Sequence, residues 1–432
     1  LSPINSLLRM THVGSSRSSA EREAGASVSQ PEGSDRPLAE CVNLGLDHIL
    51  RQAIESEDHL NWIDFNFDPQ SEAIQPSTLD LSLYSGRGGI SLVFERAYRL
   101  FGDRRWLECA RKAIALEIKS LSARGNLELI RRWTPGGMTA RAGLVSAAWA
   151  IGRHEGHGDH RSIARELAIA VSDRTLQSDK GYDIIGGAAG YMLLLLRMHE
   201  EEPLEGIDPL LGRMADHLVA HASDMDGPGW RTFSEVPLCG FGHGRAGIAL
   251  ALLEAGRFLD RADLRKVALN AFEAEHRLRG DTPARTWPDY RGVTMRTKDK
   301  AVFGASAWCA GSEGIALSRA AALQITDDRF LEDDLEFALQ TLPAPGPGRG
   351  HLCCGRAGRV LAHQTLRRLR SGVTLDEATL DRRIVSAMIE SGLGPDGGGL
   401  MGVGLFQGLS GVLWTGMSLL EDDGSDLLLL RP

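Results

Sequence analysis

The chain has 432 residues, of which 43% are hydrophobic and 24% charged, so it has enough apolar material for a sizeable core. Its formal net charge of -9 and its lack of a basic block argue against a protein that binds nucleic acid. No apolar run of about 18 residues suggests a membrane span. Six cysteines are too few for a disulfide framework and favour a reducing, cytoplasmic setting.

The first segment, residues 1–37, is predicted to lie outside the folded domain. From Val13 to Pro37 it is rich in Ser, Gly, Glu and Arg and has no aromatic residue, so we predict a disordered linker or N-terminal extension. A single domain is then expected over residues 38–432. A linker in front of a complete domain suggests that another domain is joined upstream.

A short pattern recurs seven times along the rest of the chain. Each copy has a small residue, two further residues and a glycine, and it precedes an apolar stretch. The copies begin 44 to 67 residues apart, which leaves room for two helices and two loops in each repeat. The seven copies are residues 86–89, 140–143, 187–190, 244–247, 311–314, 355–358 and 408–411.

Each repeat is predicted to form an inner helix followed by an outer one. Residues 89–101 are apolar or small on most sides, whereas residues 104–121 carry apolar side chains on one face only. Strand signals are sparse, so we predict an all-α fold. Helix pairs of this kind stack into an open solenoid or close into an α/α toroid. We favour the toroid, because the glycines allow helix starts to approach closely at an axis.

The chemically distinctive side chains share one slot, the turn before an inner helix. Cys309, Cys353, Cys354 and His243 lie one or two residues before a repeat, and Asp183 lies four before another. Parallel inner helices would bring these turns to one end of the ring. Three thiols gathered there would suit Zn²⁺ with its fourth position open, which is a catalytic arrangement. The alternative is that the three cysteines are small, inert core residues.

These motifs resemble a known family. Gly242-His243-Gly244, Trp308-Cys309-Ala310-Gly311 and Cys353-Cys354-Gly355 look like the LanC-like lanthionine cyclases. Trp62-Ile63-Asp64 and Leu83-Tyr84-Ser85-Gly86 resemble more specifically the C-terminal cyclase domain of a class II (LanM-type) lanthipeptide synthetase. The resemblance covers about residues 38 to 420, and its zinc motifs are the specific part.

The resemblance implies an α/α toroid of two seven-helix layers with one zinc ion. It implies an enzyme that adds cysteine thiols of a dehydrated precursor peptide to dehydroalanine or dehydrobutyrine, which closes thioether rings. In the class II family a dehydration domain precedes the cyclase. Two other functions stay open: a LanC-like enzyme that adds glutathione, and a non-catalytic toroid that binds peptides.

The resemblance also assigns roles to individual residues. Cys309 and Cys353 match the family's cysteine ligands, and Cys354 stands where histidine is commoner, a variant associated with relaxed substrate range. His243 matches the acid/base histidine. Asp183 matches an aspartate that would orient it, although a helix N-cap is an equally good interpretation.

Other positions carry weaker expectations. Ala310 departs from the tyrosine or histidine of many relatives, so any role of that side chain is absent or supplied elsewhere. His351 is a less favoured candidate for a fourth ligand or a second acid. Arginine in the first turn of a helix opposes the helix dipole, so a carboxylate partner is expected for each arginine that follows a repeat's first glycine. These are Arg87, Arg245 and Arg356, and the remaining cysteines, Cys41, Cys109 and Cys239, are expected in the core.

Overall fold

The computed structural model gives the fold of most of the chain. It describes residues 34–68, 73–122, 132–155, 159–281, 286–303, 306–342, 350–370, 382–394, 397, 400, 402–421, 424 and 426–431. The predicted linker over residues 1–37 lies almost wholly outside these residues. Within them, no helix is long and apolar enough to cross a bilayer.

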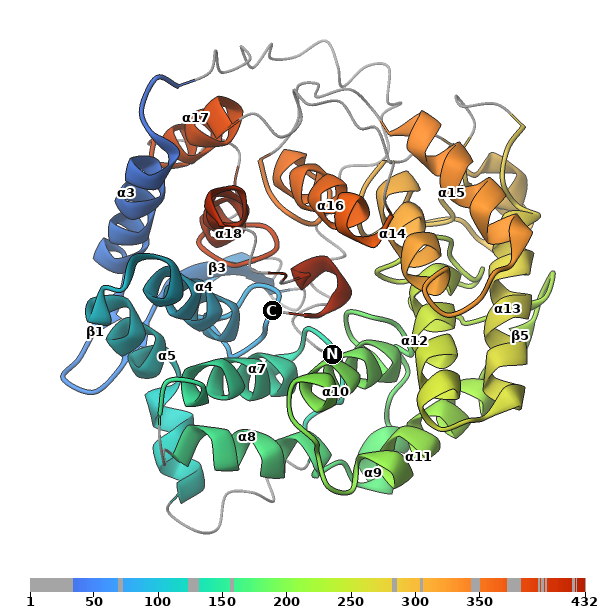
Figure 1. Ribbon diagram of the computed structural model, residues 1–432, viewed down its shortest axis with the longest axis horizontal. Coiled ribbons are helices and arrows are strands. Elements are labelled where there is room, and N and C mark those ends of the chain that lie inside the picture. Colours follow the sequence, from blue (N-terminus) through green and yellow to red (C-terminus); the bar gives the residue numbers. More distant parts are fainter. Residues whose placement is uncertain are drawn as a thin grey trace.

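Two concentric layers of helices form a ring, as Figure 1 shows, so the predicted α/α toroid is confirmed. The inner helices are almost fully buried, whereas the outer ones bury one face, as their sequences predicted. In the described part of the chain the inner layer is α4 (Arg87–Phe101), α7 (Ala140–Gly152), α10 (Ala188–Glu201), α12 (Arg245–Phe258), α14 (Ser312–Ala322), α16 (Arg356–Leu369) and α18 (Leu409–Leu420). The outer layer is α3 (Leu38–Arg51), α5 (Arg104–Ser122), α8 (Asp159–Ile169), α11 (Ile207–Ala220), α13 (Ala262–His276), α15 (Arg329–Thr341) and α17 (Arg382–Gly392).

The seventh pair corrects the expectation that every inner helix is followed by its outer partner. The first five inner helices each pack against the outer helix that follows them, whereas α17 follows α16 but packs against α18 and α3. The helix that covers α18 is α3, which comes first in the chain. It packs against both α17 and α18, and α18 in turn packs against α4 (Figure 1). The ring is therefore closed by contact between the two ends of the domain, where each end supplies an apolar helix face that the other lacks.

The last glycine of each repeat is explained by how tightly the preceding turn folds onto its helix. A Cβ at Gly190 would stand 1.8 Å from the carbonyl oxygen of Ile184, and a Cβ at Gly247 would stand 2.1 Å from that of Phe241. No side chain fits at such distances. Glycine is thus required because the chain folds back onto the first helical turn.

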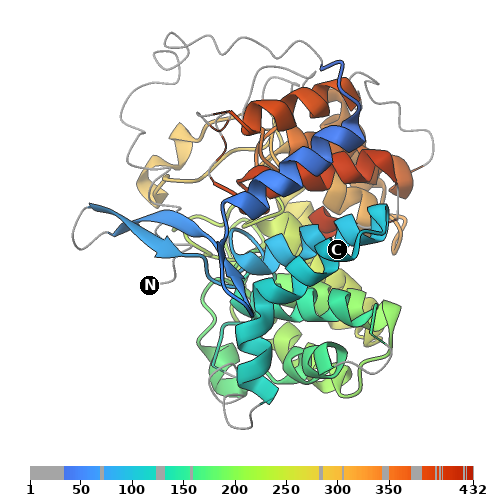
Figure 2. The same cartoon turned by 90° about the vertical axis from the view of Figure 1, so that its left-hand side faces the viewer.

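Short antiparallel strands are present as well, and the longest pair was not predicted. Strands β3 (Ile63–Asp68) and β4 (Ala73–Thr78) form a hairpin that projects from the ring in Figure 2. The alternation of apolar and polar residues in the sequence Ile-Asp-Phe-Asn-Phe-Asp was the signal for it. The shorter pairs are β1 (Ile54–Glu55) with β2 (Leu60–Asn61) and β5 (Ser223–Asp224) with β6 (Pro228–Gly229); the other short elements are α9 (Asp173–Gln177), η1 (Met295–Lys300) and η4 (Leu427–Leu429).

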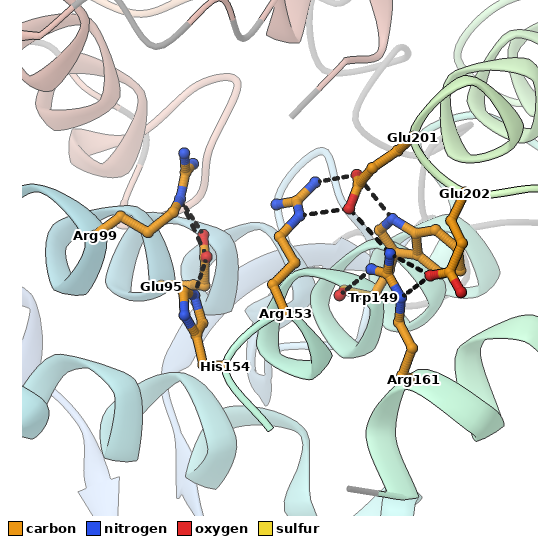
Figure 3. A network of polar contacts seen from close by, with 8 residues as sticks. All are labelled: Glu95, Arg99, Trp149, Arg153, His154, Arg161, Glu201 and Glu202. Carbon is orange, nitrogen blue, oxygen red and sulfur yellow. Dashed lines mark hydrogen bonds and ion pairs between the residues drawn. The ribbon is translucent and has the colours of Figure 1, made fainter. Parts of the chain in front are cut away.

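Polar contacts join the inner helices where their C-terminal ends meet (Figure 3). Glu201, at the end of α10, accepts hydrogen bonds from Arg153 at 2.6 and 2.9 Å and from the indole of Trp149 at 3.0 Å. Burial opposes ionisation of Glu201, but hydrogen bonds from Arg153, Trp149 and Arg161 lower its pKa to about 2. Glu95 of α4 contacts His154 beyond α7 at 2.6 Å. These contacts tie α4, α7 and α10 together at the end opposite the repeat turns.

The first-turn arginines find different partners. Arg87 makes a two-pronged ion pair with Glu117 at 2.6 and 2.8 Å, as expected. Arg245 meets no carboxylate in the part of the chain that the structure describes; its guanidinium donates to the carbonyl oxygens of Met225, Pro228 and Pro237 at 2.8 to 3.1 Å. That expectation was wrong, because backbone carbonyls of a folded-back loop satisfy the donors equally well. Arg356 has no carboxylate partner among the described residues either.

Candidate functional site

The turns before the inner helices lie side by side, as predicted, and backbone hydrogen bonds join them. The Met138 N–H donates to the Ile185 carbonyl at 2.9 Å, and the Gly242 N–H donates to the Cys309 carbonyl at 3.0 Å. Between Cys309 and Cys353, both described, no such bond is present, and here the thiols of two turns meet instead. Equivalent bonds run from Ile184 to Gly242, from Cys353 to Phe406, from Phe406 to Tyr84 and from Tyr84 to Met138.

His243 and Asp183, sixty positions apart in the sequence, form a buried pair. The Nδ1 atom of His243 lies 2.6 Å from Oδ2 of Asp183. A carboxylate can only accept a hydrogen bond, so this contact assigns the proton to Nδ1 and leaves Nε2 available for proton transfer. The other oxygen of Asp183 accepts the N–H of Gly186 at 2.7 Å. Asp183 therefore holds its own turn and contacts His243. The alternative of a helix N-cap is wrong, because α10 begins at Ala188 after its N-cap Gly187, and Asp183 bonds the N–H of Gly186 before the helix.

The three predicted zinc ligands are also brought together. Cys309 and Cys353 are buried, whereas Cys354 is exposed. A hydrogen bond with Cys353 lowers the pKa of Cys309, but a hydrogen bond with Cys354 and burial outweigh it and raise that pKa. Hydrogen bonds with Cys309 and Cys354, together with burial, raise the pKa of Cys353 well above its usual value. Burial and the mutual hydrogen bonds outweigh the positive charge of Arg291, which by itself lowers the pKa of Cys309, so these thiols resist ionisation.

The donor atoms of this cluster therefore suit zinc, but the side chains are not arranged in a coordination geometry. In the described part of the chain, no three or more His, Cys, Asp or Glu side chains are arranged to hold a metal ion. The donors themselves are those that zinc prefers, and a divalent cation would supply the positive charge that the thiolates need. The three side chains are thus gathered without forming a ready-made coordination site.

Two neighbours of the thiols were not predicted to be site residues. Burial raises the pKa of Tyr84 well above its usual value, and the nearby Cys353 and Cys309 raise it further. The Tyr84 ring stacks on Phe406, with ring centroids 5.1 Å apart. Tyr84 lies two residues before its repeat, as Cys309 and Cys353 do. Its position in the turn before an inner helix could therefore have identified it as a neighbour of the thiols. Burial opposes the charge of Arg291, but a hydrogen bond with Asp289 and the nearby Cys309 and Cys354 raise its pKa. The sequence of its long loop did not indicate that Arg291 would lie near the thiols.

His351 and the remaining cysteines are buried. The Nδ1 atom of buried His351 accepts the N–H of Cys354 at 3.5 Å, so His351 holds the turn that carries the cysteine pair. Burial raises the pKa of Cys109 to about 11 and also raises the pKa of Cys41 and Cys239. These three thiols are buried in the core, as expected.

A buried ion cluster between the inner helix α14 and the outer helices α13 and α15 supports the His243 turn. The Nη2 atom of Arg319 lies 2.8 Å from Oε2 of Glu275 and 3.0 Å from Oδ2 of Asp334. The other oxygen of Glu275 accepts the N–H of Gly240 at 2.8 Å, three residues before His243. Burial raises the pKa of Glu275 despite the adjacent guanidinium. The turn is thus fixed to helices α13, α14 and α15.

Comparisons with known proteins show the family and the fold of the chain. A family model described as lanthionine synthetase C-like protein matches residues 77–430. Nisin cyclase superposes with a TM-score of 0.64 over 81% of this chain and 92% of its own length, at 18% identity, so the two share a fold. An inactive variant of the α-1,6-mannanase GH76A of Salegentibacter sp. HEL1_6 has a TM-score of 0.44 at 11% identity, covering 89% of this chain and 99% of its own. No curated protein sequence matches the chain.

Proposed function

The chain belongs to the lanthionine synthetase C-like family, and we propose that it is a lanthionine cyclase. In this proposal it adds cysteine thiols of a dehydrated peptide to dehydroalanine or dehydrobutyrine and so closes thioether rings. The observation that carries the proposal is the Asp183–His243 pair, whose turn is hydrogen-bonded to the turn of Cys309. A proton-transfer group and a thiol cluster therefore share one end of the ring.

His243 supplies the acid/base chemistry in this proposal. The reaction forms a carbon–sulfur bond at the β-carbon of the dehydro residue, and the electron pair of the double bond moves toward the α-carbon and its carbonyl. The thiol proton leaves, and a proton must arrive at the α-carbon. Asp183 keeps the proton on Nδ1 of His243, so Nε2 can accept one proton and deliver another. The same carboxylate stabilises the imidazolium between the two transfers.

Cys309, Cys353 and Cys354 would hold the zinc ion. Bound zinc supplies a low pKa for the substrate thiol and a fixed position for the resulting thiolate. The convergence of three thiols from two adjacent turns supports this assignment. Their turns precede helices α14 and α16, whose N-terminal dipoles favour thiolate.

The expected substrate and setting follow from the same chemistry. A dehydrated peptide is the partner, and a dehydration activity, in an upstream domain or a separate protein, must supply it. All six cysteines lie in the described part of the chain and carry free thiols, which supports a reducing compartment such as the cytoplasm.

The test is ring closure on a peptide dehydrated beforehand. The purified, zinc-supplemented chain is incubated with the peptide, and uncyclised cysteines are counted by thiol alkylation and mass spectrometry. We expect a loss of alkylatable cysteine with no change in peptide mass. A mass increase only when glutathione is present would identify a glutathione-adding enzyme. Peptide binding without either reaction would identify a non-catalytic toroid and overturn the proposal.

A further inference from the structure

Asp179 lies at the base of the turn that carries Asp183, and its side chain is buried. One carboxylate oxygen accepts the N–H of Gly181 at 2.9 Å and that of Tyr182 at 3.2 Å. The other accepts the N–H of Ala188, the first residue of α10, at 3.0 Å. One side chain thus fastens the start of the turn to the start of the helix that follows it.

Tyr182, between Asp179 and Asp183, has an unusual backbone conformation. Its φ of 58° is in the left-handed region, which is unfavourable for a bulky residue because its Cβ crowds the backbone. Such a conformation persists only where the surroundings determine it. Here they do so through the carboxylate of Asp179 and through ring contacts with His217 and His221, at centroid distances of 5.5 and 5.2 Å.

The conformation of Tyr182 decides where the next side chain points. Asp183 follows directly, and it meets Nδ1 of His243 at 2.6 Å and the N–H of Gly186 at 2.7 Å. If Tyr182 returned to an ordinary φ, the Cα–Cβ direction of Asp183 would rotate away from both partners. The contact between Asp183 and His243 therefore depends on a backbone state that Asp183 does not itself maintain.

We infer that Asp179 is a positioning residue: it holds Tyr182 in the left-handed conformation and thereby aims Asp183 at His243. The inference rests on the proposed cyclase activity, in which His243 transfers protons. Asp179 touches neither substrate nor His243, so its effect must pass through Asp183. This requirement separates positioning from a general contribution to stability.

A double-mutant cycle measures that dependence. Asp179→Asn keeps the size of the side chain but places an amide N–H where an oxygen must accept a backbone N–H. Like other partners one step removed from the reacting groups, it should slow ring closure by roughly 10-fold. In the Asp183→Asn background the same change should alter the rate by less than about twofold, because the group that it positions is gone. Equal losses in both backgrounds would overturn the inference.

Asp103→Asn is the matched control. Asp103 also accepts a backbone N–H at the start of a helix, that of Arg105 at 2.9 Å, but it lies in the outer layer. Asp103→Asn should therefore leave the rate of ring closure unchanged. A readout independent of activity is the ring ¹⁵N chemical shift of His243, assigned by its loss in His243→Asn. Asp179→Asn should move it toward the Asp183→Asn value; an unmoved shift overturns the inference even if the chain is inactive on every peptide.

A second pair of variants covers the case in which Asp179→Asn does not fold. Tyr182→Asn and Tyr182→Ala both remove the aromatic ring, but asparagine tolerates a positive φ far better than alanine. If the left-handed conformation is what positions Asp183, Tyr182→Asn should close rings faster than Tyr182→Ala. Its His243 chemical shift should also stay closer to the wild-type value. Equal rates and equal shifts would show that the left-handed conformation does not position Asp183.

Discussion

The substitution Arg319→Met removes the guanidinium from the Glu275–Arg319–Asp334 cluster and should lower the free energy of unfolding. The size of the loss can be predicted because the cluster is buried. The three side chains have no exposed surface, so loss of one partner leaves a charge stranded. Asp334 keeps His276 at 2.8 Å and Arg279 at 3.2 Å. The loss in Arg319→Met therefore falls mainly on Glu275.

The expected loss is near the lower end of what breaking a buried pair costs, about 3 kcal/mol. Unfolding entropy scales with length, so for 432 residues this corresponds to a fall in Tm of roughly 3 to 4 °C. Burial raises the pKa of Glu275, and a raised carboxyl pKa means that stability is lost as pH rises through the folded-state value. Arg319→Met should therefore be less destabilising at about pH 5 than at about pH 8.

Thermal unfolding followed by circular dichroism measures this. The matched control is Arg261→Met, since Arg261 also contacts two carboxylates, Asp216 and Asp263, but on the surface. Arg261→Met should hardly change the midpoint temperature of unfolding, because exposed ion pairs contribute little to stability. Glu275→Gln in the Arg319→Met background should recover stability, because it removes the stranded charge. A loss in Arg319→Met no larger than that in Arg261→Met would refute the reasoning.

Three further predictions concern the site and its supports. His243→Asn should keep fold and zinc content but slow ring closure by about 10²- to 10⁴-fold; an unchanged rate in the alkylation assay would make His243 structural. Elemental analysis should find one zinc per chain, lost in Cys309→Ala and kept in Cys354→His; unchanged zinc in Cys309→Ala would remove it from the ligand set. Gly190→Ala should destabilise the chain, because its Cβ would stand 1.8 Å from the Ile184 carbonyl oxygen. Gly212→Ala, in open space within α11, should instead stabilise by about 0.5–1 kcal/mol in urea unfolding, and the same sign for both would contradict the packing argument.

The sequence alone determined the repeat architecture and showed which side chains share the turns before the inner helices. Inner helices could be recognised because burial on all sides demands small and apolar residues throughout, as in α12. The repeat glycines could be recognised because a carbonyl oxygen lies against the first turn of each helix, where no side chain fits. The cysteines, His243 and Asp183 could be placed together because parallel inner helices bring equivalent turns to one end.

Only the tertiary structure decided which groups meet across the ring. Nothing local shows that α3 covers α18, because ring closure is a contact between the two ends of the domain. Nothing local shows that Arg245 donates to backbone carbonyls, since a carboxylate would satisfy the same donors. The approach of Asp183 to His243 likewise depends on the left-handed Tyr182 and on Asp179, contacts that become visible only once the turn is folded onto its helix. Periodic patterns thus reveal elements that every repeat shares, whereas a pair of side chains from different repeats is fixed by packing.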